Sequence, residues 1–110
     1  MTKKMLQFVD LKQETPEKRS TGKRKGDFNE IYKEYITTKA TDQSSRCSQC
    51  GVPFCQVHCP LSNNIPDWLK LTAEGRLKEA YELSQSTNNM PEVCGRICPQ
   101  DRLCEGNCVI

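Results

Sequence analysis

The spacing of apolar residues predicts a helix from Asp27 to about residue 36. In this segment the apolar side chains recur at helical intervals and form a single stripe: Phe28, Ile31, Tyr32, Tyr35 and Ile36. Asp27, with Glu30 three residues later, has the form of a capping box, in which two side chains satisfy free N–H groups at a helix start. We expect the stripe to pack against the rest of the chain.

Two further helices are predicted between the cysteine-rich segments. The first begins at Ile65, has Pro66 in its first turn, where a missing N–H costs nothing, and runs to about Glu74 before Gly75. The second runs from Arg76 to about Ser84. Its apolar and small side chains share one side: Leu77, Ala80, Tyr81 and Ser84.

A short fourth helix is predicted from Pro91 to the residue before Pro99. It would carry Cys94 and Cys98 on one face, because residues four apart are neighbours on a helix surface. No alternating run predicts a strand. The expected fold class is therefore all-α, a small helical bundle with long irregular loops that bind a cofactor.

Residues 10–26 are charged, interrupted by proline and glycine, and without periodicity. We expect residues 1–26 to form a basic, extended N-terminal arm and residues 27–110 to form the domain. The run from Lys23 to Lys25 is typical of a solvated loop.

Charge and length exclude several functional classes. Residues 1–46 hold eleven Lys/Arg and seven Asp/Glu, and residues 47–110 hold five and seven. The net charge of +2 in 110 residues is too small to indicate nucleic-acid binding. No apolar run has the length of a signal peptide or a membrane span, so we expect no membrane association and a cytoplasmic location. In that reducing compartment, cysteines favour metal binding over disulfides.

All eight cysteines fall in two groups of four. The first reads Cys47-x2-Cys50-x4-Cys55-x3-Cys59-Pro60, and the second reads Cys94-x3-Cys98-Pro99-x5-Cys104-x3-Cys108. Eight thiolates suffice for two [4Fe–4S] clusters, and in two-cluster ferredoxins the cysteine before proline serves the other cluster. We therefore expect one cluster on Cys47, Cys50, Cys55 and Cys108. The other would be held by Cys59, Cys98 and Cys104, with Cys94 as a possible fourth ligand.

Three other uses of the cysteines are weaker. Two structural zinc ions would also take eight thiolates, but only one C-x2-C knuckle of the kind zinc sites favour is present. Four disulfides need an oxidising compartment. A catalytic thiol needs a base, and the single histidine, His58, beside Cys59, is better explained as a loop residue.

Glycines and arginines lie close to the cysteines. Gly51, Gly95 and Gly106 would let bare backbone approach sulfur and donate N–H groups, although turn formation explains them equally well. A second set could offset the negative charge of a thiolate-bound cluster or simply lie on the surface: Arg46, Arg96 and Arg102.

Three segments together, CSQCGVPFCQVHCPLSNNIPDW, TNNMPE and CGRICPQDRLCEGNC, closely resemble the N-terminal iron–sulfur domain of NADPH-dependent glutamate synthase small (beta) subunits. The same domain is found in dihydropyrimidine dehydrogenase and related NADPH flavoproteins. The resemblance, over about residues 28–108, implies an α-helical ferredoxin-like fold with two [4Fe–4S] clusters. These would relay electrons from an NADPH-reduced FAD toward the large (alpha) subunit, where glutamine and 2-oxoglutarate become two glutamates. It also supports the interleaved ligand sets given above.

The resemblance leaves two questions open. Relatives can use a non-cysteine ligand beyond the last cysteine, so the fourth ligand of the second cluster is either Cys94 or a residue beyond Ile110. The absence of G-x-G-x-x-G predicts that FAD and NADPH bind outside these residues, in other domains of a longer flavoprotein of which this chain is a fragment. By itself the chain is expected to transfer electrons without turnover. Another NADPH flavoprotein system is the alternative.

Overall fold

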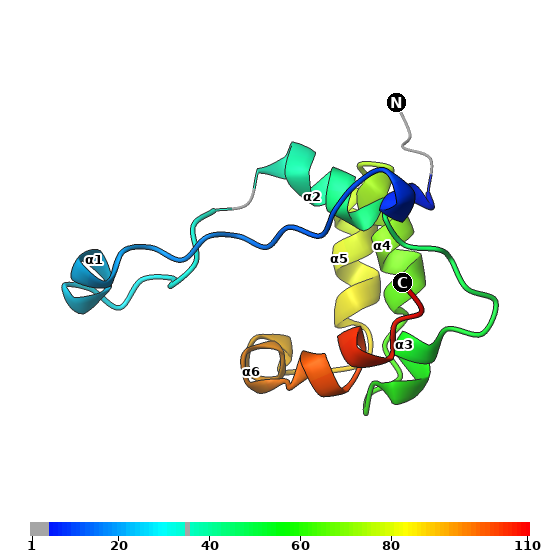
Figure 1. Ribbon diagram of the computed structural model, residues 1–110. Coiled ribbons are helices and arrows are strands. Elements are labelled where there is room, and N and C mark those ends of the chain that lie inside the picture. Colours follow the sequence, from blue (N-terminus) through cyan, green and yellow to red (C-terminus); the bar gives the residue numbers. More distant parts are fainter. Residues whose placement is uncertain (1–4, 35) are drawn as a thin grey trace.

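A computed structural model describes residues 5–34 and 36–110 of the chain (Figure 1). Its α-helices and short 3-10 helices follow in the order η1 Gln7–Val9, α1 Thr21–Lys25, α2 Thr37–Ser44, α3 Phe54–His58, α4 Ile65–Ala73, α5 Leu77–Gln85, α6 Pro91–Ile97, η2 Gln100–Arg102 and η3 Glu105–Asn107. Within the described ranges, the nearest approach to a strand is one isolated antiparallel bridge between Lys18 and Tyr32. The predicted all-α class is confirmed.

Helices α4 and α5 form an antiparallel pair at the centre of the molecule (Figure 1). Gly75, at φ 80°, ends α4, and its N–H donates to Thr72 O at 3.0 Å while the Arg76 N–H donates to Leu71 O at 2.9 Å. These two bonds satisfy carbonyls that the end of the helix would leave free. The predictions of both helices, and of the break at Gly75, are confirmed.

Small side chains form the centre of the fold. Ala73, 1% exposed, and Ala80, 6% exposed, let α4 and α5 approach closely, and α2 packs across α4. Ser45, just after α2, is fully buried, and its hydroxyl donates to Asp42 O at 2.6 Å while its carbonyl accepts the Gln7 N–H at 2.9 Å. The buried hydroxyl and carbonyl of Ser45 are therefore paired, as burial requires.

Residues 12–34 extend away from this body as a long excursion, with α1 at its far end (Figure 1). The two halves of the excursion pair through Arg19 N–H to Ile31 O at 2.7 Å and Lys33 N–H to Glu17 O at 2.6 Å. The predicted arm is thus extended in part, but it also contains α1, which the lack of periodicity did not predict. The boundary between arm and domain at residues 26 and 27 stays a prediction.

The helix predicted from Asp27 is wrong. The described residues of the apolar stripe are exposed rather than packed: Phe28, Ile31, Tyr32 and Ile36. Tyr35 lies outside the described residues.

The two carboxylates of the expected capping box have other partners. Asp27 accepts the Arg19 guanidinium at 3.1 and 2.5 Å and the Asn29 N–H at 3.0 Å, and Glu30 accepts the Arg96 guanidinium. A short helix gains most of its stability from burying one face. Because this stripe contacts no core, the side-chain pairs decide the local structure instead.

The start of the excursion is held against α2 by side chains. Gln43 donates to Lys12 O at 3.0 Å and accepts the Glu14 N–H at 2.9 Å, and Arg46 Nε donates to Leu11 O at 2.8 Å.

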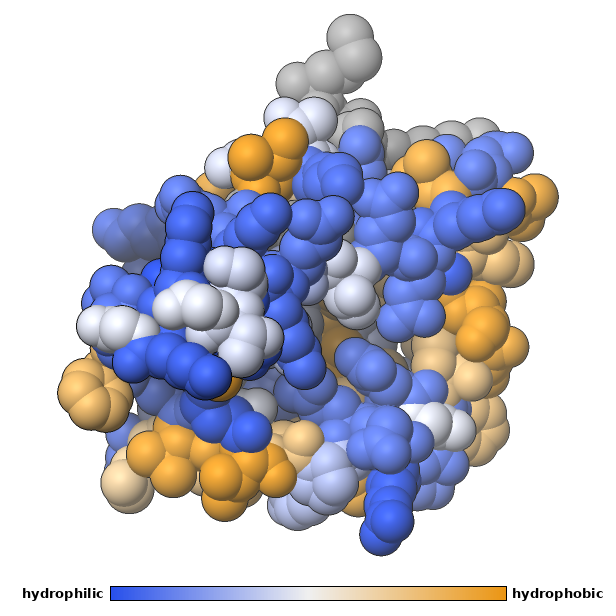
Figure 2. All heavy atoms as spheres, turned by 60° about the vertical axis from the view of Figure 1, so that its left-hand side comes forward, coloured by the Kyte–Doolittle hydropathy of each residue, from blue (hydrophilic) through white to orange (hydrophobic). Residues whose placement is uncertain are grey.

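Figure 2 shows the face that lies on the left-hand side of Figure 1. This face is mostly hydrophilic, with apolar side chains in separate groups. In the described ranges, no helix is both long and apolar enough to cross a bilayer.

Candidate metal centre

The first cysteine group lies on the loop between α2 and α3 and on α3 itself. Cys47 and Cys50 are in the loop, Cys55 is in the first turn of α3, and Cys59 follows the last residue of that helix. Cys59 adopts an extended conformation, as expected for a residue before proline. The chain therefore presents these thiols from a loop and a helix end, which lets them point in different directions.

The second group lies on α6 and on the turns that follow it. Cys94 is inside α6, whereas Cys98 is the first residue beyond it and has an extended ψ of 126°. The helix predicted from Pro91 is confirmed, but Cys98 does not share its face with Cys94. The residue before a proline is driven out of the helical region, so the helix ends one residue before Cys98. Cys104 and Cys108 flank η3 on its two sides.

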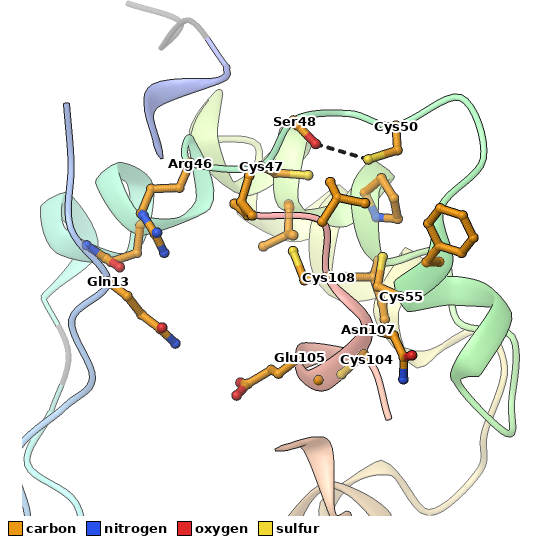
Figure 3. A pocket seen from close by; sticks show the side chains of 18 of the residues that line it. Gln13, Arg46, Cys47, Ser48, Cys50, Cys55, Cys104, Glu105, Asn107 and Cys108 are labelled. Atoms are coloured by element: carbon orange, nitrogen blue, oxygen red, sulfur yellow. Dashed lines mark hydrogen bonds between the residues drawn. The ribbon is translucent and has the colours of Figure 1, made fainter. Parts of the chain in front are cut away.

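Cysteines of both groups meet at one cavity of about 440 Å³ (Figure 3). The thiols that line it are Cys47, Cys50, Cys55, Cys104 and Cys108. Its volume lies in the ~300–1,000 Å³ range of cofactor and ligand pockets. Cys59, Cys94 and Cys98 do not line the cavity. Among the described residues, no three cysteine, histidine or acidic side chains converge on a point that could hold a single metal ion.

A network of amides fixes α3 relative to the central helix pair. Asn63 accepts the Trp68 indole N–H at 2.6 Å and donates to Ser84 O at 2.8 Å and to Thr87 Oγ1 at 2.9 Å. Gln56, on α3, donates to Asn64 Oδ1 at 2.7 Å. The loop that follows Cys59 is therefore tied to α3, α4 and the end of α5. Sequence reasoning missed these residues, since amides in a loop have no periodicity.

Hydrogen bonds reach two of the cavity sulfurs. Gln49 donates to Cys47 Sγ from its backbone N–H at 3.4 Å and from its side-chain amide at 3.3 Å. The Ser48 hydroxyl lies 3.0 Å from Cys50 Sγ (Figure 3). Neither residue was singled out from the sequence, although both stand between the cysteines of the single C-x2-C knuckle.

Burial changes the acidity of two thiols. It raises the pKa of Cys55 and of Cys104 above the ordinary value, and neighbouring cysteines act in the same direction. The electrostatic neighbours of Cys55 are Cys47, Cys108 and Cys104, and Cys104 has Cys98 as a neighbour. Metal binding at these sulfurs must therefore displace protons, so we expect metal loading to be pH-dependent.

The other predicted residues have different roles. A Cβ on Gly106 would lie 2.9 Å from the carbonyl carbon of Asp101 and closer still to its oxygen, whereas Gly51 and Gly95 have no atom within 4 Å of such a Cβ. Of these three glycines, Gly106 alone needs bare backbone, and it needs it against a carbonyl rather than a sulfur. His58 Nδ1 lies 2.8 Å from Phe54 O, one helical turn back.

Two of the three arginines near the cysteines make hydrogen bonds to groups other than sulfur, although Arg46 also lines the cysteine cavity. Arg46 bonds Leu11 O and Arg96 pairs with Glu30. The hydrogen bond of Arg96 to Glu30 joins α6 to the excursion of residues 12–34. This contact, rather than charge compensation at a sulfur, accounts for Arg96.

A helical domain with eight unpaired thiols, most of them on loops and helix ends and five of them around one cavity, has the donor set of an iron–sulfur protein. The family described as dihydropyrimidine dehydrogenase domain II, 4Fe-4S cluster, matches residues 24–110. The chain belongs to this family. The predicted resemblance and the predicted [4Fe–4S] chemistry are confirmed, and they take precedence over the zinc alternative.

Several individual proteins are also similar to this chain in sequence. The glutamate synthase [NADPH] small chain of Azospirillum brasilense is 69% identical over 107 residues, which are 97% of this chain and 22% of the relative. The protein of the same name from Escherichia coli K12 is 51% identical over all of this chain and 23% of its own length. The putative oxidoreductase UacF of Escherichia coli K12 is 48% identical over 86% of this chain and 15% of its own. The chain thus spans less than a quarter of these relatives.

Proposed function

We propose that this chain is the electron-transfer domain of the small subunit of an NADPH-dependent glutamate synthase. In the full-length polypeptide it would take electrons from an FAD reduced by NADPH and pass them toward the large subunit. There they would support glutamate synthesis from glutamine and 2-oxoglutarate in the cytoplasm. The similarity to two small chains of that name, at 69% and 51% identity, supports this assignment.

The single observation that carries the proposal is the cavity shared by the two cysteine groups. Cys47 and Cys108 stand 61 positions apart in the chain and line the same cavity, together with Cys50 and Cys55. These four thiols are the ligand set that we propose for the first cluster. Such a set closes only when both groups are folded together, so cluster binding would also join the two ends of the domain.

For the second cluster we propose Cys59, Cys98 and Cys104. Cys104 has Cys98 as an electrostatic neighbour, but it is also a neighbour of Cys55 and lines the cavity of the first set, so this grouping rests on the cysteine spacing and the family resemblance. The fourth ligand is Cys94 or a residue beyond Ile110. Both cubanes exchange one electron at a time when bound. The chain's own contribution is to hold the ligand sulfurs, most of them half-buried, and to position them against the flavin-bearing domains.

Iron and acid-labile sulfide should be counted in the full-length polypeptide purified without oxygen. We expect about eight irons and eight sulfides per chain, since two cubanes hold that number. A Cys108→Ser variant should lose the first cluster. A Cys94→Ser variant reports on the open ligand: it loses the second cluster if Cys94 binds iron and keeps both clusters if it does not. Colourless protein with stoichiometric zinc would refute the proposal.

The same domain in another NADPH flavoprotein oxidoreductase is the second candidate. It is supported by the 48% identity to UacF, which is named only as a putative oxidoreductase. The two candidates separate on one measurement: NADPH oxidation by the full-length polypeptide with its large subunit should depend on both glutamine and 2-oxoglutarate. Oxidation that ignores both substrates would favour the second candidate.

A further inference from the structure

Gln49 stands in an unusual backbone conformation between two cavity cysteines. Its φ of 54° lies in the left-handed region, which residues other than glycine rarely adopt. Such strained residues persist where the surroundings hold them, and they concentrate at functional sites. Here the conformation aims the Gln49 backbone N–H at Cys47 Sγ, at 3.4 Å.

The Gln49 side chain makes the same contact a second time. Its amide donates to Cys47 Sγ at 3.3 Å and to the carbonyl of Pro66, in the first turn of α4, at 2.7 Å. One amide group therefore connects the cysteine loop to a helix of the central pair. Because Pro66 is buried, the donor is held in place rather than free to turn toward solvent.

Ser48 makes the corresponding contact with the next cysteine, at 3.0 Å from Cys50 Sγ (Figure 3). Either atom can donate while the sulfur is a thiol. Once the sulfur binds iron it is a thiolate without a proton, and the Ser48 hydroxyl alone can donate.

We propose that Ser48 and Gln49 raise the reduction potential of the cluster bound by Cys47 and Cys50. The inference rests on the function proposed above. Reduction adds one electron to the cluster and moves no proton, so the negative charge on the ligand sulfurs increases. Donors fixed against these sulfurs stabilise the more negative state, which favours reduction. The two residues act as positioned donors and touch no substrate.

The test is an anaerobic redox titration of the full-length, cluster-loaded polypeptide, followed by electron paramagnetic resonance. Gln49→Leu removes the side-chain donor and should lower the one-electron reduction equilibrium constant of one cluster by roughly three- to tenfold, tenfold being about 59 mV. Ser48→Ala should act on the same cluster in the same direction. The other cluster should keep its potential.

Matched changes at residues that do not line the cysteine cavity serve as controls. Gln85, on α5, bonds Ser84 Oγ, and Ser86 donates to Leu83 O, so Gln85→Leu and Ser86→Ala should leave both potentials unchanged. The sign of the change in reduction potential distinguishes the loss of a hydrogen-bond donor from a loosening of the loop. Water admitted to the sulfurs would stabilise the reduced cluster and raise the potential, whereas a lost hydrogen bond lowers it.

Gln49→Gly provides a second test if Gln49→Leu fails to assemble its cluster. Glycine accepts the left-handed conformation and keeps the backbone N–H while it removes the amide. An unchanged or raised potential in the loaded variants of Gln49 and Ser48 would overturn the inference and leave the proposed function intact. Wild-type protein without acid-labile sulfide would overturn the proposed function, and this inference with it.

Discussion

Gly106 lies between two proposed cluster ligands, Cys104 and Cys108, and all three residues line the cavity. An added Cβ would lie 2.9 Å from the carbonyl carbon of Asp101 and closer still to its oxygen. Both atoms belong to the backbone, so no side-chain rotation relieves the contact. Gly106→Ala must therefore move either η2, which contains Asp101, or η3 itself.

The required movement can be worked from the structure. Ordinary contact begins at 3.4 Å, so the carbonyl carbon alone requires a shift of about 0.5 Å, the difference between 3.4 and 2.9 Å, and the oxygen requires more. Metal and cofactor sites tolerate displacements of only about 0.5 Å. Overpacking of this kind costs about 1–3 kcal/mol. Because Cys104 and Cys108 are assigned to different clusters, both clusters should be impaired.

Iron and sulfide per chain and the thermal midpoint of the anaerobically purified full-length polypeptide measure the effect. The matched control is Gly95→Ala, within α6 and next to Cys94, where no atom lies within 4 Å of the added Cβ. There the substitution should stabilise the helix by about 0.5–1 kcal/mol and preserve both clusters. If Gly106→Ala binds as much iron as wild type with an unchanged midpoint, the assigned close contact at Asp101 is refuted.

Two further predictions concern contacts that fix the excursion and the cysteine loops. The Arg96 guanidinium, hydrogen-bonded to Glu30, lowers the pKa of that carboxyl from 4.5 to about 2. The ion pair between Glu30 and Arg96 should therefore be complete above pH 4.5 and be lost as the pH falls through about 2. A distance between the excursion and α6, measured spectroscopically, should lengthen in that pH window. A Glu30→Gln variant should show no such pH dependence. Asn63→Ala leaves the Trp68 indole and two other groups without partners and should destabilise the cluster-free protein by about 1–3 kcal/mol in urea unfolding. Asn89→Ala, at an exposed position, is the control and should leave the unfolding midpoint unchanged.

Elements with signals at their own ends were predictable. Pro66 and Gly75 mark the start and stop of α4, and Pro91 and Pro99 bracket α6. Proline and glycine start or end a helix through their own backbone conformation, so these helix ends can be predicted without knowing which distant residues pack against them.

Elements whose stability depends on a partner were not predictable. The stripe that begins at Phe28 has helical periodicity, but its described residues are exposed and do not pack in the core. Conversely, α2 has a polar sequence and no stripe, yet it is helical because it packs across α4. In both cases the tertiary contact, or its absence, overrides the local pattern.

The sequence by itself determined the chemistry of this protein. Eight cysteines in two groups of four, each with a Cys-Pro step, predicted iron–sulfur binding because the donor atoms are covalently present in the chain. It could not determine which thiols line one cavity, or that Gly106 lies against Asp101 and Glu30 against Arg96. Those contacts are distances between separate stretches of backbone, and only the packing of α2, α4 and α5, with the turns around them, brings these stretches together.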